Sequence, residues 1–252
     1  MFSWSEPDRL PLIVGHRGSP SLAPENTLAS FQQALDDGAD AVECDVRMTG
    51  DGKIVVIHDA GLRRTTDGRG LVARHTLREL RLLSAGRWFH RRFAPERIPV
   101  LDELLELTAG RCGVNIEIKV DARVPMAEVV DRCCRIVREH RAQERVLISS
   151  FSHRVVRNAS LARPRIATGL LYHPLRHLVK RPVLFTRSLG ARYLIMNGTS
   201  LRKGIVAEAH ERNLFVGEYV VNSARRWNRS RRFGVDAIFT DSPARFQHLR
   251  HR

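Results

Sequence analysis

The sequence predicts an α/β protein with a TIM-type (β/α)8 barrel and a small insertion after the second barrel strand. Short apolar runs alternate with amphipathic stretches from one end of the chain to the other. Strands that alternate with helices pair in parallel through helical crossovers. The chain has 252 residues, and about 250 is the usual length of one such barrel. We therefore expect a single barrel domain over residues 1–252.

Eight runs of the sequence have strand character. They are Leu12–His16, Ala41–Val46, Gly113–Val120, Val146–Phe151, Ile166–Tyr172, Ala191–Met196, Leu214–Asn222 and Ala237–Thr240. Apolar residues in most of the intervening stretches recur about every 3.6 positions, as in amphipathic helices. The clearest predicted helix is Pro125–Arg141, which has a proline at its start. An open, doubly wound sheet is disfavoured because no GxGxxG motif follows the first strand.

One region interrupts this alternation. Between Val46 and the helix that starts near Pro99 lie IVVIHD and a polar, arginine-rich stretch. In a barrel, such an extra segment belongs to a βα loop on the catalytic face. We expect an insertion over the active site at about residues 47–98, and no separate domain.

The composition is strongly basic. The formal net charge is +15, and 38 of the 42 basic residues are arginine, which indicates a codon preference. The basic residues are dispersed except at 176–181 and 225–232. No nucleic-acid-binding signature accompanies them. A solvated surface is therefore favoured over a nucleic-acid partner, and weak peripheral contact with an anionic membrane stays open.

The sequence also bears on location. No run approaches the roughly 20 apolar residues of a membrane helix, and the N-terminus lacks the features of a signal peptide. Four cysteines are too few and too irregular for a disulfide framework or a zinc site. We expect a cytoplasmic protein, and the sequence does not specify its oligomeric state.

Charged residues occur inside two predicted strands. In AVECDV, Glu43 and Asp45 are two positions apart and share one face, and in NIEIKV the same holds for Glu117 and Lys119. Charges on the inner face of a barrel are costly unless they lie at its open C-terminal end. Barrel enzymes have their catalytic groups at that end.

A histidine, His58, can be placed by hairpin geometry. The MTGDGK stretch predicts a tight turn, with Asp51-Gly52 as a strong hairpin signal. A turn at Asp51-Gly52 pairs His58 with Asp45, and a turn one residue earlier pairs it with Glu43. Either register brings His58 beside the carboxylates.

These residues form a site of recognisable chemistry. LIVGHRG adds His16 and Arg17 at a strand end. Three carboxylates without a cysteine or third histidine suit a hard cation such as Mg2+ or Ca2+. Such an ion, with Arg17 and Lys119, would neutralise a phosphate, and His16 and His58 could act as base and acid.

From about residue 12 to residue 243, the chain resembles the glycerophosphodiester phosphodiesterase family. The matching stretches are GHRGSPSLAPENTLASF, GADAVECDVRMTGDGKIVVIHD, LRRTTDGRG, ERIPVLDELL, NIEIK, ISSF and GVDAIFTDSP. The resemblance implies a TIM barrel with an insertion after its second strand. It also implies that the two catalytic histidines are His16 and His58 and that the metal ligands are Glu43, Asp45 and Glu117. The family often has WTVN where this chain has YVVN, so Tyr219 would keep an aromatic wall in the glycerol pocket.

The resemblance implies hydrolysis of a small glycerophosphodiester to sn-glycerol 3-phosphate and an alcohol, with Mg2+ or Ca2+ as cofactor. We favour His16 as base and His58 as acid, with the reverse order open. The sequence specifies neither the leaving alcohol nor whether a cyclic phosphate forms.

Two alternative functions remain. A lysophospholipase D acting on single-chain lysophospholipids would be favoured if Leu62, Leu71, Trp88 and Phe89 are exposed, but a small core within the insertion is the preferred interpretation. A non-catalytic phosphate- or membrane-binding module is disfavoured because no expected ligand or proton-transfer residue is missing.

Overall fold

Eight parallel strands close into a barrel in the computed structural model, which describes residues 2–7, 11–162, 164–177 and 181–250. The strands are β1 (Leu12–Gly15), β2 (Ala41–Met48), β4 (Gly113–Ile118), β5 (Val146–Ser150), β6 (Ala167–Tyr172), β7 (Tyr193–Asn197), β8 (Phe215–Tyr219) and β9 (Ala237–Thr240). Strand β1 pairs with both β2 and β9, so the sheet closes on itself. The predicted (β/α)8 barrel is confirmed.

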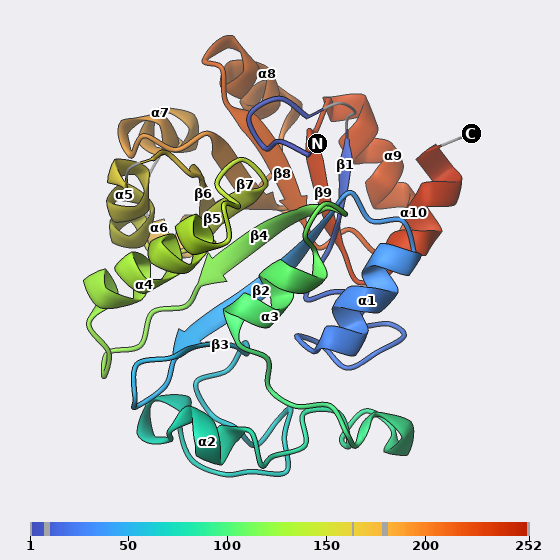
Figure 1. Cartoon of the computed structure of the whole chain (residues 1–252). Coiled ribbons are helices and arrows are strands. Elements are labelled where there is room, and N and C mark those ends of the chain that lie inside the picture. The colour runs from blue at the N-terminus through green and yellow to red at the C-terminus, as the bar shows by residue number, and fades with distance from the viewer. Residues whose placement is uncertain (1, 8–10, 163, 178–180, 251–252) are drawn as a thin grey trace.

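Helices surround the barrel (Figure 1). They are α1 (Leu28–Asp36), α3 (Leu101–Leu107), α4 (Met126–Glu139), α5 (His153–Leu161), α6 (Pro174–His177), α7 (Pro182–Ser188), α8 (Lys203–Glu211), α9 (Ala224–Phe233) and α10 (Pro243–Arg250). The predicted helix at 125–141 corresponds to α4, which has Pro125 as its N-cap and His140 as its C-cap. None of the helices in the described part of the chain has the length and apolarity that crossing a membrane requires.

Both faces of the barrel strands are buried. On β2, Val42, Cys44 and Val46 pack outward in one cluster with residues of the covering helices, whereas Ala41 belongs to the barrel interior. Such two-sided burial explains why the strands appear as nearly continuous apolar runs. In the interior, Trp4 is fully buried, and its indole N–H donates to the carbonyl of Arg145.

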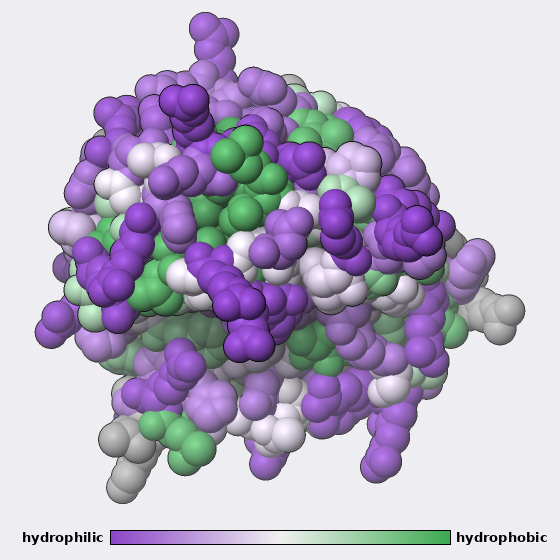
Figure 2. Space-filling model, turned by 90° about the horizontal axis from the view of Figure 1, so that it is seen from below, coloured by the Kyte–Doolittle hydropathy of each residue, from purple (hydrophilic) through white to green (hydrophobic). Residues whose placement is uncertain are grey.

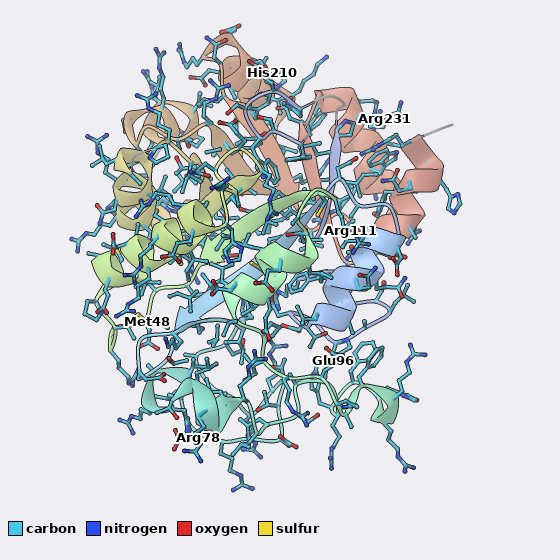
Figure 3. All side chains as sticks on the ribbon, viewed as in Figure 1. Met48, Arg78, Glu96, Arg111, His210 and Arg231 are labelled. Carbon is cyan, nitrogen blue, oxygen red and sulfur yellow. The ribbon has the colours of Figure 1, made fainter. Side chains whose placement is uncertain are left out.

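The segment between β2 and α3 lies at the end of the barrel toward which β2 points (Figure 1). It contains β3 (Ile54–Val56), α2 (Leu77–Leu80) and two short 3-10 helices, Val72–Arg74 and Arg91–Phe93. Its buried apolar residues form a small cluster of their own: Val55, Ile57, Leu62, Val72, Leu80, Ala85 and Ile98. Glu96 accepts a hydrogen bond from the Ala29 N–H at the start of α1. Figure 3 labels Glu96 between α1 and the rest of this segment.

The hairpin of β2 and β3 has a register that the sequence analysis did not predict. Both predicted pairings, His58 with Asp45 or with Glu43, are wrong. Continuing the observed ladder places His58 opposite Cys44.

The loop of this hairpin explains the difference. Thr49 donates its N–H to the Lys53 carbonyl at 2.9 Å, so residues 50–52 form a three-residue loop. Gly52 ends that loop in the left-handed conformation, with φ +77°. A three-residue loop shifts the pairing by one position relative to a two-residue turn. Beyond β3 the chain bends at His58, so strand alternation no longer determines the direction of the imidazole.

Candidate functional site

Three carboxylates lie close together inside the C-terminal end of the barrel. Strands β2 and β4 are neighbours, and their register pairs Asp45 with Glu117. Glu43, Asp45 and Glu117 are at most 8% exposed. Each offers an oxygen within 4.8 Å of the other two.

The turn after β1 is hydrogen-bonded to this cluster. Arg17 has a left-handed backbone, with φ +56°, and its N–H donates to Glu43 Oε2 at 2.8 Å. Gly18 follows with φ +93°, and a Cβ at this position would lie 2.4 Å from Ser30 Oγ. Only glycine fits this close approach to α1. The HRG sequence therefore brings the Arg17 backbone to the Glu43 carboxylate.

Two cations and one amide surround Asp45. Arg17 Nε lies 3.2 Å from one carboxylate oxygen and Lys119 Nζ 2.9 Å from the other. Lys119 also pairs with Glu117. Asn26 donates its side-chain N–H to Asp45 Oδ2 at 2.8 Å and accepts the Asp45 N–H at 3.2 Å.

Burial and neighbouring charges give these carboxyl groups different proton affinities. Burial raises the pKa of Glu43 to about 8, and the charge of Asp45 contributes to the rise. Burial also raises the pKa of Glu117. Burial opposes ionisation of Asp45 as well, but Lys119 and Arg17 outweigh it and hold the pKa of Asp45 below its usual value. Asp45 therefore stays charged near neutral pH, whereas Glu43 and Glu117 hold a proton more readily than ordinary glutamates do.

Both predicted catalytic histidines are oriented by an aspartate. His16 Nδ1 lies 2.7 Å from Asp241 Oδ1, and His58 Nδ1 lies 2.6 Å from Asp59 Oδ1. In each imidazole, Nε2 is therefore the nitrogen left for proton transfer.

The surroundings shift the two imidazoles in opposite directions. Burial lowers the pKa of His16, but the hydrogen bond to Asp241 and the charge of Glu43 raise it above its usual value. Burial lowers the pKa of His58, and the positive charges of Lys119 and Arg17 lower it further. The negative charge of Asp45 raises it by less, so the pKa of His58 lies below its usual value.

A chain of ion pairs connects the two histidine loops. Arg64 Nε lies 2.6 Å from Asp59, and its Nη1 lies 2.7 Å from Glu25. Glu25 in turn accepts from Arg17 Nη1 at 2.8 Å. Arg64 thus joins the insertion, which carries His58, to the turn after β1.

A cavity of about 290 Å3 lies over these groups. Seven of the eight predicted site residues line it: His16, Arg17, Glu43, His58, Glu117, Lys119 and Tyr219. Asp45, the eighth, lies beneath them and contacts Arg17 and Lys119. Phe151 also lines the cavity, with its ring 6.0 Å from that of Tyr219.

Of the apolar residues whose exposure would favour a lysophospholipid, only Trp88 is exposed, and Leu71 and Phe89 are half-buried. Leu62 is buried in the cluster within the insertion, and Trp88, 43% exposed, stacks edge-on with Phe89. None of them lines the catalytic cavity. Viewed from the side of the insertion, the surface is mostly hydrophilic (Figure 2).

Several residues of the site were not predicted: Glu25, Asn26, Asp59, Arg64, Phe151 and Asp241. Asp241 could have been found, because it follows a barrel strand directly, as His16 does. Asp59 is adjacent to His58 in sequence. Nothing in the sequence periodicity indicates that Glu25 and Asn26 turn back toward β2.

The carboxylate cluster fits a hard cation. Glu43 Oε1 is buried and has no hydrogen-bond partner among the described residues. A buried carboxylate oxygen without a partner is costly, and a bound cation would satisfy it. The cluster offers only oxygen donors, which Mg2+ and Ca2+ prefer.

The chain matches a known family over most of its length. The model of the glycerophosphoryl diester phosphodiesterase family matches residues 16–245. A glycerophosphodiester phosphodiesterase from Caldanaerobacter subterraneus is 36% identical over 92% of this chain and 94% of the relative. One from Bacillus altitudinis is 34% identical over 94% of this chain and 97% of the relative.

Solved structures of phosphodiesterases are also similar to this chain over most of its length. An Oleispira antarctica phosphodiesterase in complex with the product sn-glycerol-3-phosphate has a TM-score of 0.90 and is 31% identical, covering 96% of this chain and 98% of that one. A glycerophosphodiester phosphodiesterase from Agrobacterium tumefaciens has a TM-score of 0.80 and is 32% identical, covering 93% of this chain and 98% of that one.

Proposed function

This chain belongs to the glycerophosphoryl diester phosphodiesterase family, and we propose that it hydrolyses glycerophosphodiesters to sn-glycerol 3-phosphate and an alcohol. The observation that carries the proposal is the convergence of two Asp-oriented histidines on one buried carboxylate cluster. The product bound in the Oleispira antarctica relative supports sn-glycerol 3-phosphate as the product here. We propose that the reaction takes place in the cytoplasm.

We propose that Glu43, Asp45 and Glu117 hold one divalent cation, Mg2+ or Ca2+. The unpartnered Glu43 oxygen and the all-oxygen donor set support this assignment. When bound, the cation would draw charge from the phosphate and lower the pKa of the glycerol 2-hydroxyl.

The substrate phosphate would lie between Arg17 and Lys119. Both cations line the cavity and are held in place by Asp45. They would stabilise the charge that grows on the non-bridging oxygens as the transition state forms. Tyr219 and Phe151 would provide an aromatic wall beside the glycerol.

His16 and His58 would transfer the protons. Asp241 and Asp59 hold the two rings by Nδ1, so Nε2 of one would take a proton from the attacking group, which is water or the glycerol 2-hydroxyl. After attack by the 2-hydroxyl, a water molecule would open the cyclic phosphate to sn-glycerol 3-phosphate. Nε2 of the other would give a proton to the departing alcohol. We assign His16 as the base and His58 as the acid.

Removing one cluster carboxylate tests the metal assignment. Glu43→Gln and Glu117→Gln should abolish turnover of glycerophosphocholine while circular dichroism stays unchanged. Each should also weaken Mg2+ or Ca2+ binding measured by calorimetry. Glu106→Gln, at an exposed position on α3, is the matched control and should behave as the wild type.

Excess chelator should stop the wild-type reaction, and added Mg2+ or Ca2+ should restore it. Full activity in chelator, or rescue by zinc alone, would contradict an all-oxygen cation site. The same assay with glycerophosphoethanolamine and lysophosphatidylcholine would separate the proposed activity from that of a lysophospholipase D.

A further inference from the structure

The catalytic cavity adjoins two further hollows, one beside each histidine. A hollow of about 580 Å3 shares His16 and Arg17 with the cavity. The other, of about 440 Å3, shares His58, Lys119 and Phe151 with it. We call these the His16 lobe and the His58 lobe. A diester has two substituents on its phosphorus, so two lobes suit its two halves.

The two lobes differ in charge. In the His16 lobe, Arg17 and Arg245 are balanced by Glu25 and Asp241, so any net charge is that of a protonated His16. The charged residues that line the His58 lobe are Arg47, Lys119 and Arg176 against Glu117 alone. The His58 lobe therefore has an excess of two positive charges when Glu117 is ionised.

Lys119 pairs with both Asp45 and Glu117 and is assigned to the scissile phosphate, so its charge does not distinguish one leaving alcohol from another. The free charges in the His58 lobe are therefore those of the two guanidinium groups.

Neither guanidinium forms an ion pair in the described part of the chain. Arg47 donates from Nε to the His58 carbonyl at 2.9 Å, whereas its Nη1 is buried without a hydrogen-bond partner. Arg176 lies 4.9 Å from the centre of the Phe151 ring, over its face. Four carboxylates act on Arg47 only at longer range, and each of them pairs with another cation: Asp121, Asp45, Asp59 and Glu117.

We propose that the His58 lobe receives the leaving alcohol and selects alcohols that carry an anionic group, through Arg47 and Arg176. A guanidinium with unused N–H donors matches the paired oxygens of a phosphodiester or carboxylate. This inference rests on the proposed function, in which His58 protonates the leaving alcohol. It names the substrate class as glycerophosphodiesters of acidic alcohols.

Two substrates with the same scissile bond test the inference. Glycerophosphoglycerol releases a neutral alcohol, whereas bis(glycerophospho)glycerol releases an alcohol that carries a second phosphodiester. At low salt, wild-type kcat/KM should be roughly 3- to 10-fold higher for bis(glycerophospho)glycerol, the range expected for one or two partly exposed charge contacts. Because bis(glycerophospho)glycerol has two equivalent scissile bonds, its kcat/KM is halved before the ratio is taken. The ratio should fall as salt is added.

Variants separate the lobe from the general basic surface. Arg176→Gln should bring the ratio close to one, because it should lower kcat/KM for bis(glycerophospho)glycerol more than kcat/KM for glycerophosphoglycerol. Arg47→Gln should lower the ratio too, even if the loss of its contact with the His58 carbonyl slows both substrates. Arg225→Gln, on α9, removes a surface charge of the same kind and should leave the ratio unchanged.

A wild-type ratio of one or less would overturn the inference, as would a ratio that neither lobe variant alters. If Arg225→Gln lowers the ratio as much as the lobe variants do, the preference comes from the net charge of the protein. That result would also overturn the inference. Hydrolysis of neither substrate would count against the proposed function itself.

Discussion

Two imidazoles with the same kind of aspartate partner differ in proton affinity because of the other charges near them. His16 lies beside Glu43, which helps to raise its pKa, whereas Lys119 and Arg17 help to lower the pKa of His58. These directions favour a charged His16 and a neutral His58, the reverse of what the assigned roles need before reaction. A cation at Glu43 would offset one of the charges that raise the pKa of His16. The order of roles stays a prediction that kinetics must decide.

Replacing each histidine by alanine should lower the rate by roughly 10²–10⁴-fold, the usual effect of losing a positioned proton-transfer group. A p-nitrophenyl phosphodiester has a leaving group that needs little protonation. We expect this substrate to rescue His58→Ala in part and His16→Ala not at all, measured by p-nitrophenolate release. In the double variant the losses should not multiply if the pair acts as a unit.

The opposite pattern, with rescue of His16→Ala alone, would reverse the two roles. Failure to rescue either variant would indicate that the histidines mainly position the phosphate. Near-normal activity in one single variant would refute the proton-transfer mechanism.

At the scale of one element, α9 illustrates how a basic run can be only partly a surface feature. Arg226 donates to the Val220 carbonyl at 2.6 Å, and Arg229 pairs at 2.6 Å with Glu218, which is fully buried. Figure 3 labels Arg231 on this helix; its guanidinium lies 5.8 Å from the centre of the Trp227 ring. Part of this basic run therefore supports the fold.

Glutamine replacements within α9 should separate these roles. Arg225→Gln with Arg232→Gln should change neither turnover of a soluble substrate nor sedimentation with anionic vesicles. Arg229→Gln should lower the free energy of unfolding by about 3 kcal/mol, because it leaves the Glu218 carboxylate buried without its cation. Weaker vesicle binding by the double variant, with turnover preserved, would instead show that α9 docks on membranes.

The same scale explains what the sequence could predict. Periodicity located the barrel strands and α4 to within a few residues, and the ExD and EIK patterns indicated the face that carries Glu43 and Glu117. The β2–β3 register was missed because it depends on the length of the loop, which has three residues and ends at Gly52. The Asp51-Gly52 pair indicates a two-residue turn equally well. Trp4 was also missed, because its burial depends on contacts with distant strands that no local pattern records.

At the scale of the whole molecule, the barrel interior has two unlike ends. Around Trp4 and Tyr193 it is apolar and closely packed. At the C-terminal end it holds Glu43, Asp45 and Glu117 close together. Like charges in a buried site oppose folding unless a proton or a cation offsets them. The stability of the fold should therefore be linked to both pH and divalent cations.

The sign of this linkage follows from the shifted carboxyl groups. Burial raises the pKa of Glu43 from its ordinary value of 4.5 to about 8, and the pKa of Glu117 is also raised. Between these values the folded protein binds more protons than the unfolded one, so its stability falls as pH rises. The lowered pKa of Asp45 acts in the opposite sense, but its contribution is lost only as the pH falls below the ordinary value of 3.8.

In chelator, the melting temperature should therefore be lower at pH 9 than at pH 6. Saturating Mg2+ or Ca2+ should raise the melting temperature more at pH 9 than at pH 6, because a bound cation takes the place of the proton on Glu43. Scanning calorimetry at the two pH values, with and without cation, measures both effects. Glu43→Gln keeps an acceptor for the Arg17 N–H but cannot titrate, so it should flatten the pH dependence in chelator. A wild-type melting temperature that is no lower at pH 9, or an unchanged slope in this variant, would show that the carboxylate cluster does not control the stability of the barrel.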